Sequence, residues 1–465
     1  MPQSLYQEIT YKDPFLDFSS FAGQKGSIFL DSAPSNDYKW PAGTGRYSFF
    51  SYDPVHIFTS KNGKITFKDQ TFEGNPFDVL QKSLTEFKCT NHPNLPPWQG
   101  GVAGYFSYDL CHHLEKLPSP KDDLGFDDLA LGYYDVVAAY DHKDKKAWVI
   151  STGYPEIEES KRLKRAKERL DDFAARIQNA EPISLKAPSP LPALDCNFIS
   201  ETYQQAVQKV IDYIYAGDIF QANLSRRLSA DLPDGYDPLA LYQKLRNENP
   251  APFSAYFNAA PTYILSSSPE RFLKSNQGKI ETRPIKGTRK RSTDPKEDAK
   301  LARELLESEK DQAENVMIVD LMRNDLSKVC EPFSVGVPSL LELESYATVH
   351  HLVSTVVGTL KPELDNIDLL KATFPGGSIT GAPKIRAMEI IAELEPSQRG
   401  PYCGSIGYIG FDGNMDTNIA IRTLTVQENK ICFQVGGGIV ADSHPLEEYI
   451  ETETKAAALT KILTK

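Results

Sequence analysis

The first 150 residues alternate between short apolar runs and turn-forming residues. Four runs are rich in β-branched and aromatic side chains and are bounded by Gly, Pro, Asn or Asp: residues 27–32, 47–52, 64–67 and 135–140. Such runs are typical of short strands joined by tight turns. Glycines within residues 100–109 predict a place where two backbones pack closely. We expect this part of the chain to form one layer of β-sheet.

A pattern of apolar residues at helical spacing begins after these strands. Residues 156–178 combine charged residues with an apolar stripe, which predicts an amphipathic surface helix. Three prolines within residues 187–193 favour extended backbone and mark a linker. We therefore divide the chain into an N-terminal β-rich region (1–180), a proline-rich linker (181–195) and a C-terminal region (196–465).

The C-terminal region mixes helices and strands. Apolar positions from Tyr203 to Ile214 predict a helix that ends at Ala216-Gly217 and leads into a strand. By the same patterns we expect strands within residues 263–288 and 341–360 and from 401 onward, two helical pieces across 295–328, and a helix over the last twenty residues.

Composition and charge exclude several classes of protein. The net charge of −12 argues against a general nucleic-acid-binding protein, which needs a basic surface for phosphates. No apolar run reaches the roughly 18 residues of a membrane span, and the N-terminus lacks the basic start and apolar core of a secretory signal. We therefore expect a soluble, cytoplasmic protein. Its six cysteines form no C-x-x-C pair, so neither a zinc site nor a disulfide framework is predicted.

The stretch 281–291 contains the first candidate for chemistry. Pro284 fixes φ and Gly287 permits a turn, so we expect a strand to deliver Lys286 onto a loop. A lysine becomes a nucleophile when burial or nearby cations lower its pKa, and the cations available in sequence are Arg283, Arg289, Lys290 and Arg291. A solvated basic turn is the commoner explanation of such a run, because most runs of charge are solvated faces.

The last helix contains two carboxylates and a lysine on one face. Glu448, Glu451 and Lys455 are spaced three and four residues apart, so they line up on a helix. Two carboxylates can hold Mg²⁺ together with waters and an anionic substrate. Glu314, on another predicted helix, can complete such a site. An ordinary surface pair of Glu and Lys is the alternative.

Glycine-rich segments and isolated polar residues supply further candidates. The segment 374–384 has Ala382 where a phosphate loop needs lysine, which disfavours nucleotide binding, although a helix beginning at Pro383 favours a carboxylate at its N-terminus. Gly436, Gly437 and Gly438 lie in a predicted strand, where they either expose N–H groups to an anion or allow close packing.

Three polar side chains have a chemical and a structural interpretation. Arg422 lies in an otherwise apolar predicted strand and needs an anionic partner if it is buried. His351 has apolar neighbours, which more often surround a core histidine than a catalytic one. Glu270 follows a strand and is either a general acid or part of a surface turn with Arg271.

Taken in chain order, eight segments resemble the chorismate-utilising enzyme family, and within it the aminodeoxychorismate synthase component I branch. The resemblance covers nearly all of residues 196–462 and, more loosely, 27–140. The segments are 217–225, 268–272 (Ser-Pro-Glu-Arg-Phe), 283–288 (Arg-Pro-Ile-Lys-Gly-Thr), 314–325, 350–354 (His-His-Leu-Val-Ser), 380–384 (Thr-Gly-Ala-Pro-Lys), 436–443 and 451–452.

The family resemblance implies a fold and a branch of the family. The fold is α+β and like that of anthranilate synthase component I, with two large antiparallel β-sheets packed as a sandwich and helices outside, and 196–465 is the chorismate-binding catalytic region. Family members that add water are expected to carry lysine where this chain has Gln221, so ammonia use is implied. Anthranilate synthases usually have alanine at the position of Lys286, where the para-directing enzymes have lysine.

The resemblance also implies residue roles. Lys286 matches a covalent nucleophile and Glu270 a general acid, while Glu314, Glu448 and Glu451 match ligands of Mg²⁺. Other positions match contacts to substrate or around the metal: Gln221, Thr288, His351, Thr380, Tyr402, Arg422, Gly436, Gly437, Gly438 and Lys455. Tryptophan-regulated members often show Leu-Leu-Glu-Ser where this chain has Phe-Leu-Asp-Ser, so Asp31 and Ser32 mark a candidate tryptophan pocket whose regulatory use is in doubt.

The implied function is the conversion of chorismate and ammonia to 4-amino-4-deoxychorismate, a precursor of para-aminobenzoate and folate. None of the six cysteines lies in the Gly-x-Cys-x-Gly turn of a glutamine amidotransferase, and the chain ends soon after its last predicted helix, so we expect a separate glutaminase subunit as partner. Anthranilate synthase component I is one alternative, and a non-catalytic regulatory subunit is another.

Overall fold

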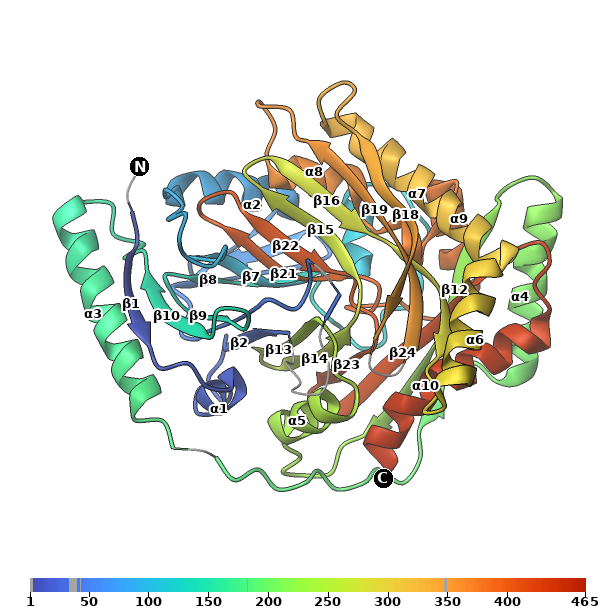
Figure 1. Cartoon of the computed structure of the whole chain (residues 1–465), viewed down its shortest axis with the longest axis horizontal. Helices are drawn as coiled ribbons and strands as arrows, with labels where there is room; N and C mark the ends of the chain where they lie inside the picture. Colours follow the sequence, from blue (N-terminus) through green and yellow to red (C-terminus); the bar gives the residue numbers. More distant parts are fainter. Residues whose placement is uncertain (1–2, 33–39, 42, 182, 347–348) are drawn as a thin grey trace.

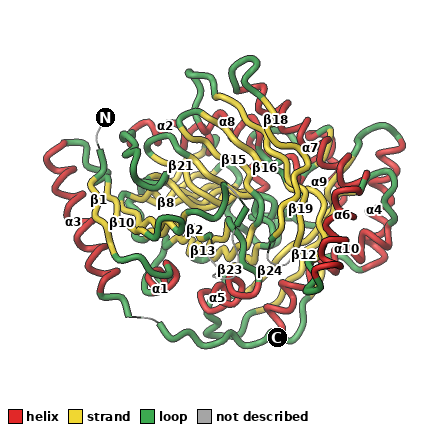
Figure 2. Tube along the Cα trace, in the orientation of Figure 1, coloured by secondary structure: helices red, strands yellow, loops and turns green. Residues whose placement is uncertain are grey.

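The computed structural model describes residues 3–32, 40–41, 43–181, 183–346 and 349–465. Within these residues the chain forms two twelve-stranded sheets, and every pairing between named strands is antiparallel. Helices lie around the outside of the strands (Figures 1 and 2). The predicted α+β class and the sandwich architecture are confirmed.

The first sheet runs in the order β1-β10-β9-β3-β2-β13-β14-β23-β24-β12-β11, with β20 paired to β12. Its strands are β1 (Leu5–Ile9), β2 (Ile28–Asp31), β3 (Tyr47–Ser51), β9 (Val136–Asp141), β10 (Lys146–Ser151), β11 (Asp195–Cys196), β12 (Gln221–Asp231), β13 (Phe253–Ala259), β14 (Thr262–Ser268), β20 (Gly381–Ala382), β23 (Thr423–Gln427) and β24 (Lys430–Ile439).

The second sheet runs in the order β17-β19-β16-β15-β22-β21-β7-β8-β4-β5-β6, with β18 paired to β19. Its strands are β4 (His56–Lys61), β5 (Lys64–Phe67), β6 (Gln70–Glu73), β7 (Gly101–Phe106), β8 (Leu129–Tyr134), β15 (Arg271–Asn276), β16 (Lys279–Arg283), β17 (Ile285–Lys290), β18 (Gly336–Ser345), β19 (Val349–Thr359), β21 (Ser405–Gly410) and β22 (Met415–Asn418).

The helices begin at residues that suit helix N-termini, such as the Asp, Asn or Ser caps of α1, α2, α5, α6, α7 and α8. The α-helices are α1 (Pro14–Ser19), α2 (Pro76–Leu84), α3 (Glu159–Gln178), α4 (Ser200–Tyr215), α5 (Pro238–Glu248), α6 (Pro295–Glu307), α7 (Glu309–Val329), α8 (Asn366–Thr373), α9 (Lys384–Leu394) and α10 (Pro445–Thr464). Short 3₁₀ turns are η1 (Thr85–Phe87), η2 (Tyr108–His113) and η3 (Gly377–Ile379).

The N-terminal strands do not form a single layer, and that expectation is wrong. The first sheet takes β1, β2, β3, β9 and β10 from the N-terminal region, whereas the second takes β4 to β8. Each sheet is completed by strands from residues 196–465, which no pattern local to one region can reveal. The division at residues 181–195 stays a prediction. Residues 183–194 of the linker run along the outside of the molecule (Figure 1), and the N–H of Leu191 donates to the carbonyl of Leu463 (2.8 Å).

Three apolar layers hold the sandwich together. Between the sheets, residues of the first sheet such as Val137 and Ile264 pack with Tyr105 and Tyr408 of the second. The outer face of the first sheet packs on α1, α3, α5 and α10, the outer face of the second packs on α2, α7 and α8, and α4 and α9 pack together on β12 and β24 of the first sheet. Burying this much apolar surface is the main source of the stability of such a fold.

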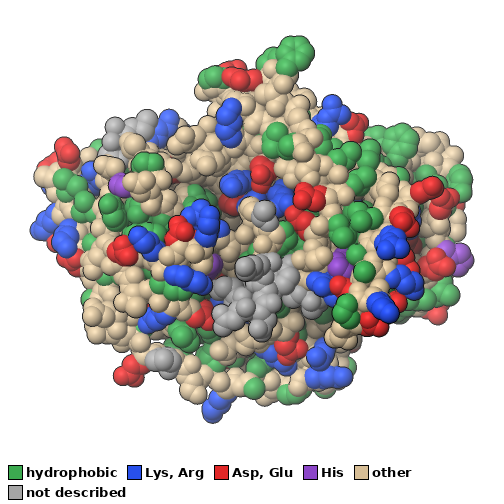
Figure 3. Space-filling view, in the orientation of Figure 1, with side chains coloured by type: hydrophobic (Ala, Val, Ile, Leu, Met, Phe, Trp, Pro, Cys, Tyr) green, Lys and Arg blue, Asp and Glu red, His purple; other side chains and the backbone are tan. Residues whose placement is uncertain are grey.

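Two further observations concern the charge of the surface and the apolar length of the helices. Lys and Arg side chains are interspersed with Asp and Glu on the face in Figure 3. No helix in the described ranges is both long enough and apolar enough to cross a bilayer.

Candidate active site

A cavity of about 1250 Å³ opens where the two sheets meet near their ends. Its walls come from β12 and β24 of the first sheet, β17 and β19 of the second, and helices α7 and α10. Most of the predicted site residues line it: Glu270, Lys286, Thr288, Glu314, His351, Tyr402, Arg422, Gly436, Gly438, Glu451 and Lys455. The sandwich therefore brings together residues that lie up to 185 positions apart in the sequence.

Lys286 projects from a strand and not from the predicted loop. Pro284 separates β16 from β17, and Lys286 pairs with Leu352 in the β17–β19 ladder. Burial lowers the pKa of the Lys286 ammonium; the Glu314 carboxylate opposes this shift and the Lys455 ammonium adds to it. A larger fraction of Lys286 is thus neutral at a given pH than for a lysine in water. The alternative of a solvated basic turn does not fit this position in the cavity wall.

The cations expected to lower that pKa are engaged elsewhere, so this explanation is wrong. Lys290 is exposed at the end of β17. The three arginines each pair with a carboxylate: Arg283 with Glu344, Arg289 with Asp311 and Arg291 with Asp298. These pairs hold β16 against β18, β17 against α7, and the residue after β17 against α6. Desolvation, which sequence proximity cannot show, is the main cause of the shift at Lys286.

Glu270 lies buried in the turn between β14 and β15. Its Oε1 accepts a hydrogen bond from the N–H of Ile285 (3.3 Å), next to Lys286. Burial raises the pKa of Glu270 to about 7, and hydrogen bonds from Ser378 and Ile285 limit the rise. Such a carboxyl can carry a proton near neutral pH, as a general acid must. Arg271 is also buried, paired with Asp416 and Glu281, so the alternative of a surface turn is wrong.

Two carboxylates of α10 meet beside β24. A Cβ placed on Gly437 would lie 3.1 Å from Glu448 Oε2 and 3.6 Å from Glu451 Oε1, so both carboxylates lie close to the strand at this glycine. Lysines stand beside both carboxylates: Lys455 Nζ is 2.7 Å from Glu451, and Lys310 Nζ is 3.8 Å from Glu448. The site is small and acidic. A metal cation bound there can take the place of the ammonium groups of Lys455 and Lys310.

The residues present fit Mg²⁺ as an ion held jointly with a ligand. Among the described residues no three Asp, Glu, His or Cys side chains form a ready-made metal cluster. Mg²⁺ needs only one or two protein carboxylates when waters and an anionic substrate supply the rest, and Glu448 and Glu451 can provide them. Burial raises the pKa of the carboxyls of Glu314 and Glu448, a cost that a bound cation would relieve.

An open backbone edge borders the same cavity. β23 pairs with β24 only over Lys430–Phe433, so among the described strands none covers that edge of β24 from Gln434 to Ile439. Alternate N–H groups there can donate to an anion. The amide of Gln221 is fully buried and neither of its polar atoms has a partner among the described residues. A Cβ on Gly438 would overlap this amide and lie 3.5 Å from Lys286 Nζ, so Gln221 lies close to Lys286.

Arg422 and His351 present unpaired groups to the cavity. Arg422 immediately precedes β23 with φ of 51°, so it is not part of the strand as predicted. It makes no ion pair with a described carboxylate, and burial lowers the pKa of its guanidinium. His351 Nδ1 is 2.8 Å from the Thr288 hydroxyl, while its Nε2 has no described partner. Burial lowers the pKa of His351 to about 3, so the ring is neutral.

Comparisons with known proteins agree with this geometry. The family model described as chorismate binding enzyme matches residues 35–461. The chain belongs to the chorismate binding enzyme family. It is similar to anthranilate synthase component 1 of Thermus thermophilus (42% identity over 90% of this chain and 89% of that protein) and to aminodeoxychorismate synthase component 1 of Klebsiella aerogenes (44% over 83% and 82%). The crystal structure of anthranilate synthase component I from Streptococcus pneumoniae TIGR4 matches with a TM-score of 0.79 and 33% identity, covering 98% of this chain and 99% of the other.

Two residues singled out in this chorismate binding enzyme lie away from the cavity. Asp31 pairs with Arg246 and accepts a hydrogen bond from Ser48. The Ser32 hydroxyl donates to the carbonyl of Tyr47 (2.6 Å). Both residues thus take part in a buried polar network at the end of β2, and the tryptophan pocket stays a prediction.

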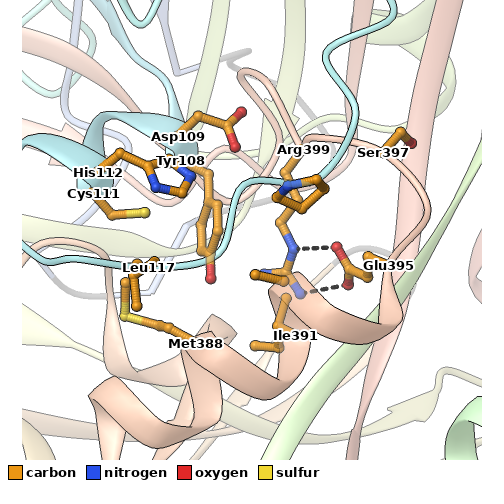
Figure 4. Close-up of a pocket in the computed structure, with 12 residues that line it drawn as sticks. Tyr108, Asp109, Cys111, His112, Leu117, Met388, Ile391, Glu395, Ser397 and Arg399 are labelled. Carbon is orange, nitrogen blue, oxygen red and sulfur yellow. Dashed lines mark hydrogen bonds and ion pairs between the residues drawn. The ribbon is translucent and has the colours of Figure 1, made fainter. Parts of the chain in front are cut away.

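The loop before α9 holds a predicted residue and a missed one. The Thr380 hydroxyl donates to the Gly376 carbonyl (3.0 Å), so Thr380 shapes the loop and does not line the cavity. Ser378, which lines the cavity with Glu270, lies within residues 374–384, a segment considered above only as a phosphate loop or a helix N-terminus. Arg399 was not predicted as a site residue, because a single arginine near Glu395 in the sequence has no pattern that distinguishes it from a surface arginine. Figure 4 shows this pair beside a second cavity of about 10 Å³.

Proposed function

We propose that this chorismate binding enzyme is an aminodeoxychorismate synthase component I, which forms 4-amino-4-deoxychorismate from chorismate and ammonia for para-aminobenzoate and folate synthesis. The observation that carries the proposal is Lys286: an amine with a lowered pKa in the wall of the cavity, flanked by Glu270 and Glu314. The similar proteins do not decide between branches, since both named activities occur at 42–44% identity. Lysine at this position is the residue that the resemblance associates with amination at C4.

The charge of the cavity suits an anionic substrate. Eight Lys or Arg and five Asp or Glu residues line it, an excess of positive charge in a chain whose net charge is −12. Chorismate carries two carboxylates. We place one on Arg422 and on those N–H groups of Gly436–Gly438 that point away from β12, because these are donors without a protein anion, and the other near Glu448 and Glu451. There Mg²⁺, when bound, neutralises charge and orients the substrate.

The proposed reaction is a double displacement. The neutral amine of Lys286 forms a bond to ring C2, the ring double bonds shift, and the C4–O bond breaks while Glu270 donates a proton so that water leaves. Ammonia then attacks C4, the double bonds shift back, and the C2–N bond to Lys286 breaks. The extra proton on the new amine is available to restore Glu270. Two displacements place nitrogen at C4 with retention of configuration.

A product assay tests the proposal. Purified protein, chorismate, Mg²⁺ and an ammonium salt should yield a product that a lyase converts to para-aminobenzoate. Strong fluorescence of anthranilate from the protein alone would instead assign the chain to the anthranilate branch. No consumption of chorismate under any ammonia supply would favour a non-catalytic subunit.

A further inference from the structure

Lys384, the first residue of α9, has an ammonium group enclosed by three acceptors. Its Nζ lies 2.5 Å from Asp325 Oδ2, 2.7 Å from the carbonyl of Thr373 and 2.8 Å from the carbonyl of Pro375. The side chain is 13% exposed. An ammonium has three N–H donors, so this set satisfies all of them.

The position of Lys384 is unfavourable for the helix that carries it. A cation at a helix N-terminus opposes the helix dipole, and the first turn of α9 contains no acidic residue to offset it. Burial of the ammonium adds a desolvation cost, which the carboxylate of Asp325 offsets. The ammonium instead reaches the carbonyl of Thr373 at the C-terminus of α8, where a cation is favourable, so Lys384 joins the end of α8 to the loop that follows it.

The two carbonyls lie where α8 ends and the loop that runs into the cavity begins. Thr373 ends α8, and the loop from Phe374 to Thr380 delivers Ser378 to Glu270. Lys384 holds the beginning of this loop against Asp325 of α7. The far end is held separately: Arg399 donates to the carbonyl of Ile379 (3.0 Å) and is itself paired with Glu395, as in Figure 4.

We propose that Lys384 is a positioning residue for chorismate amination: it fixes the loop 374–380 so that Ser378 stays beside Glu270 in the wall of the cavity. The proposal rests on the role of Glu270 in the proposed function. Loss of the ammonium leaves the carbonyls of Thr373 and Pro375 without this donor. Asp325 keeps its ion pair with Lys328 (2.9 Å). The effect is thus expected in the loop and at Glu270, not in the attachment of α7.

The test compares Lys384→Met with Lys328→Met. The first removes the donors to the loop and keeps the aliphatic stem; the second removes the more exposed partner of the same carboxylate and leaves the loop untouched. Chorismate consumption with ammonium is measured, whatever the product. We expect Lys384→Met to lower kcat about 100-fold with little change in KM, the scale of a small misplacement of a reacting group, and Lys328→Met to leave both near wild type.

A double-mutant cycle separates positioning from general weakening. If Lys384 acts through Ser378, Lys384→Met combined with Ser378→Ala should lose no more activity than the worse single variant. Multiplied losses, or a folded Lys384→Met with wild-type kcat, would overturn the proposal. If Lys384→Met does not fold, Lys384→Gln is measured in the same cycle, and failure of both to fold would show that Lys384 serves the fold alone. Formation of anthranilate would refute the proposed function but leave this test intact.

Discussion

At the scale of single residues, Lys286 is the decisive side chain. If its amine forms the C2–N bond, Lys286→Ala should abolish amination, and Lys286→Arg should not restore it, because a guanidinium stays protonated and cannot attack. Mass spectrometry during slowed turnover should find a chorismate-derived adduct on the peptide that contains Lys286. Turnover at the wild-type rate by the arginine variant would rule out the covalent role.

Glu270 predicts a pH dependence of the rate. As a general acid it must be protonated, and its pKa is raised to about 7, so kcat at a fixed concentration of free ammonia should fall as the pH rises through about 7. Glu270→Gln should lower kcat by about 10²- to 10⁴-fold and remove this limb of the profile. A wild-type profile that is flat across this range would contradict the assignment.

The same carboxyl predicts a pH dependence of stability. Its folded pKa of about 7 exceeds the ordinary value of 4.5, so between these values the folded state binds more protons than the unfolded state. The stability that Glu270 contributes is therefore present at low pH and is lost as the pH rises through about 7. The melting temperature of Glu270→Gln relative to wild type should increase from pH 5 to pH 8, and a constant difference would show that Glu270 is not buried with a raised pKa.

At the scale of elements, β24 depends on glycine where it passes the cavity. Gly438→Ala would place a methyl group against the amide of Gln221 and near Lys286, so kcat/KM should fall about 10- to 100-fold by displacement of these groups. Gly336→Ala in β18 is the matched control, since the nearest neighbour of its Cβ would be 4.0 Å away. Equal kinetics for the two variants would mean that the space beside Gly438 is not used.

Helix α10 contributes charge to the site as well as packing to the first sheet. Glu451→Gln keeps the size of the side chain and removes its charge, so Mg²⁺-dependent binding of chorismate should weaken at least about 10-fold while the melting temperature changes little. Calorimetric titration over a range of Mg²⁺ concentrations measures this. Glu447→Gln, at an exposed position of the same helix, should bind like wild type. Binding of chorismate that is unaffected by EDTA would contradict the assignment.

At the scale of the whole molecule, the six cysteine thiols indicate whether this chain can generate its own ammonia from glutamine. Glutamine hydrolysis by an amidotransferase needs an activated cysteine thiolate. Burial raises the pKa of five of the six thiols, to about 12 for Cys89, Cys403 and Cys432. Cys403, which lines the cavity, is thus a poor nucleophile.

We therefore expect glutamine to be inert with this chain alone and to become a nitrogen source when a glutamine amidotransferase subunit is added. Ammonium salts should support the reaction without that subunit. The measurement is release of glutamate from glutamine by the homogeneous chain, with and without the partner. Stoichiometric release by the isolated chain would show that no separate glutaminase is needed.

Much of this molecule follows from local sequence. Apolar alternation and turn residues predict β5, β12 and β24, and helical spacing predicts α3, α4 and α10, because these patterns reflect which faces of an element are buried. The order of short motifs identified the family and eleven of the residues that line the cavity, since each motif is continuous in the sequence. Glu448, Glu451 and Lys455 were also found from local sequence, because the helical repeat alone brings them to one face.

Only the tertiary structure decided how these pieces work together. The interleaving of N-terminal and C-terminal strands in both sheets depends on pairings between distant residues, which no local pattern contains. Burial at the junction of the sheets, and not the neighbouring arginines, lowers the pKa of Lys286 and raises that of Glu270. The support of Glu270 by Ser378 and of its loop by Lys384 is likewise a product of packing, because hydrogen bonds and desolvation are set by what surrounds a residue in space.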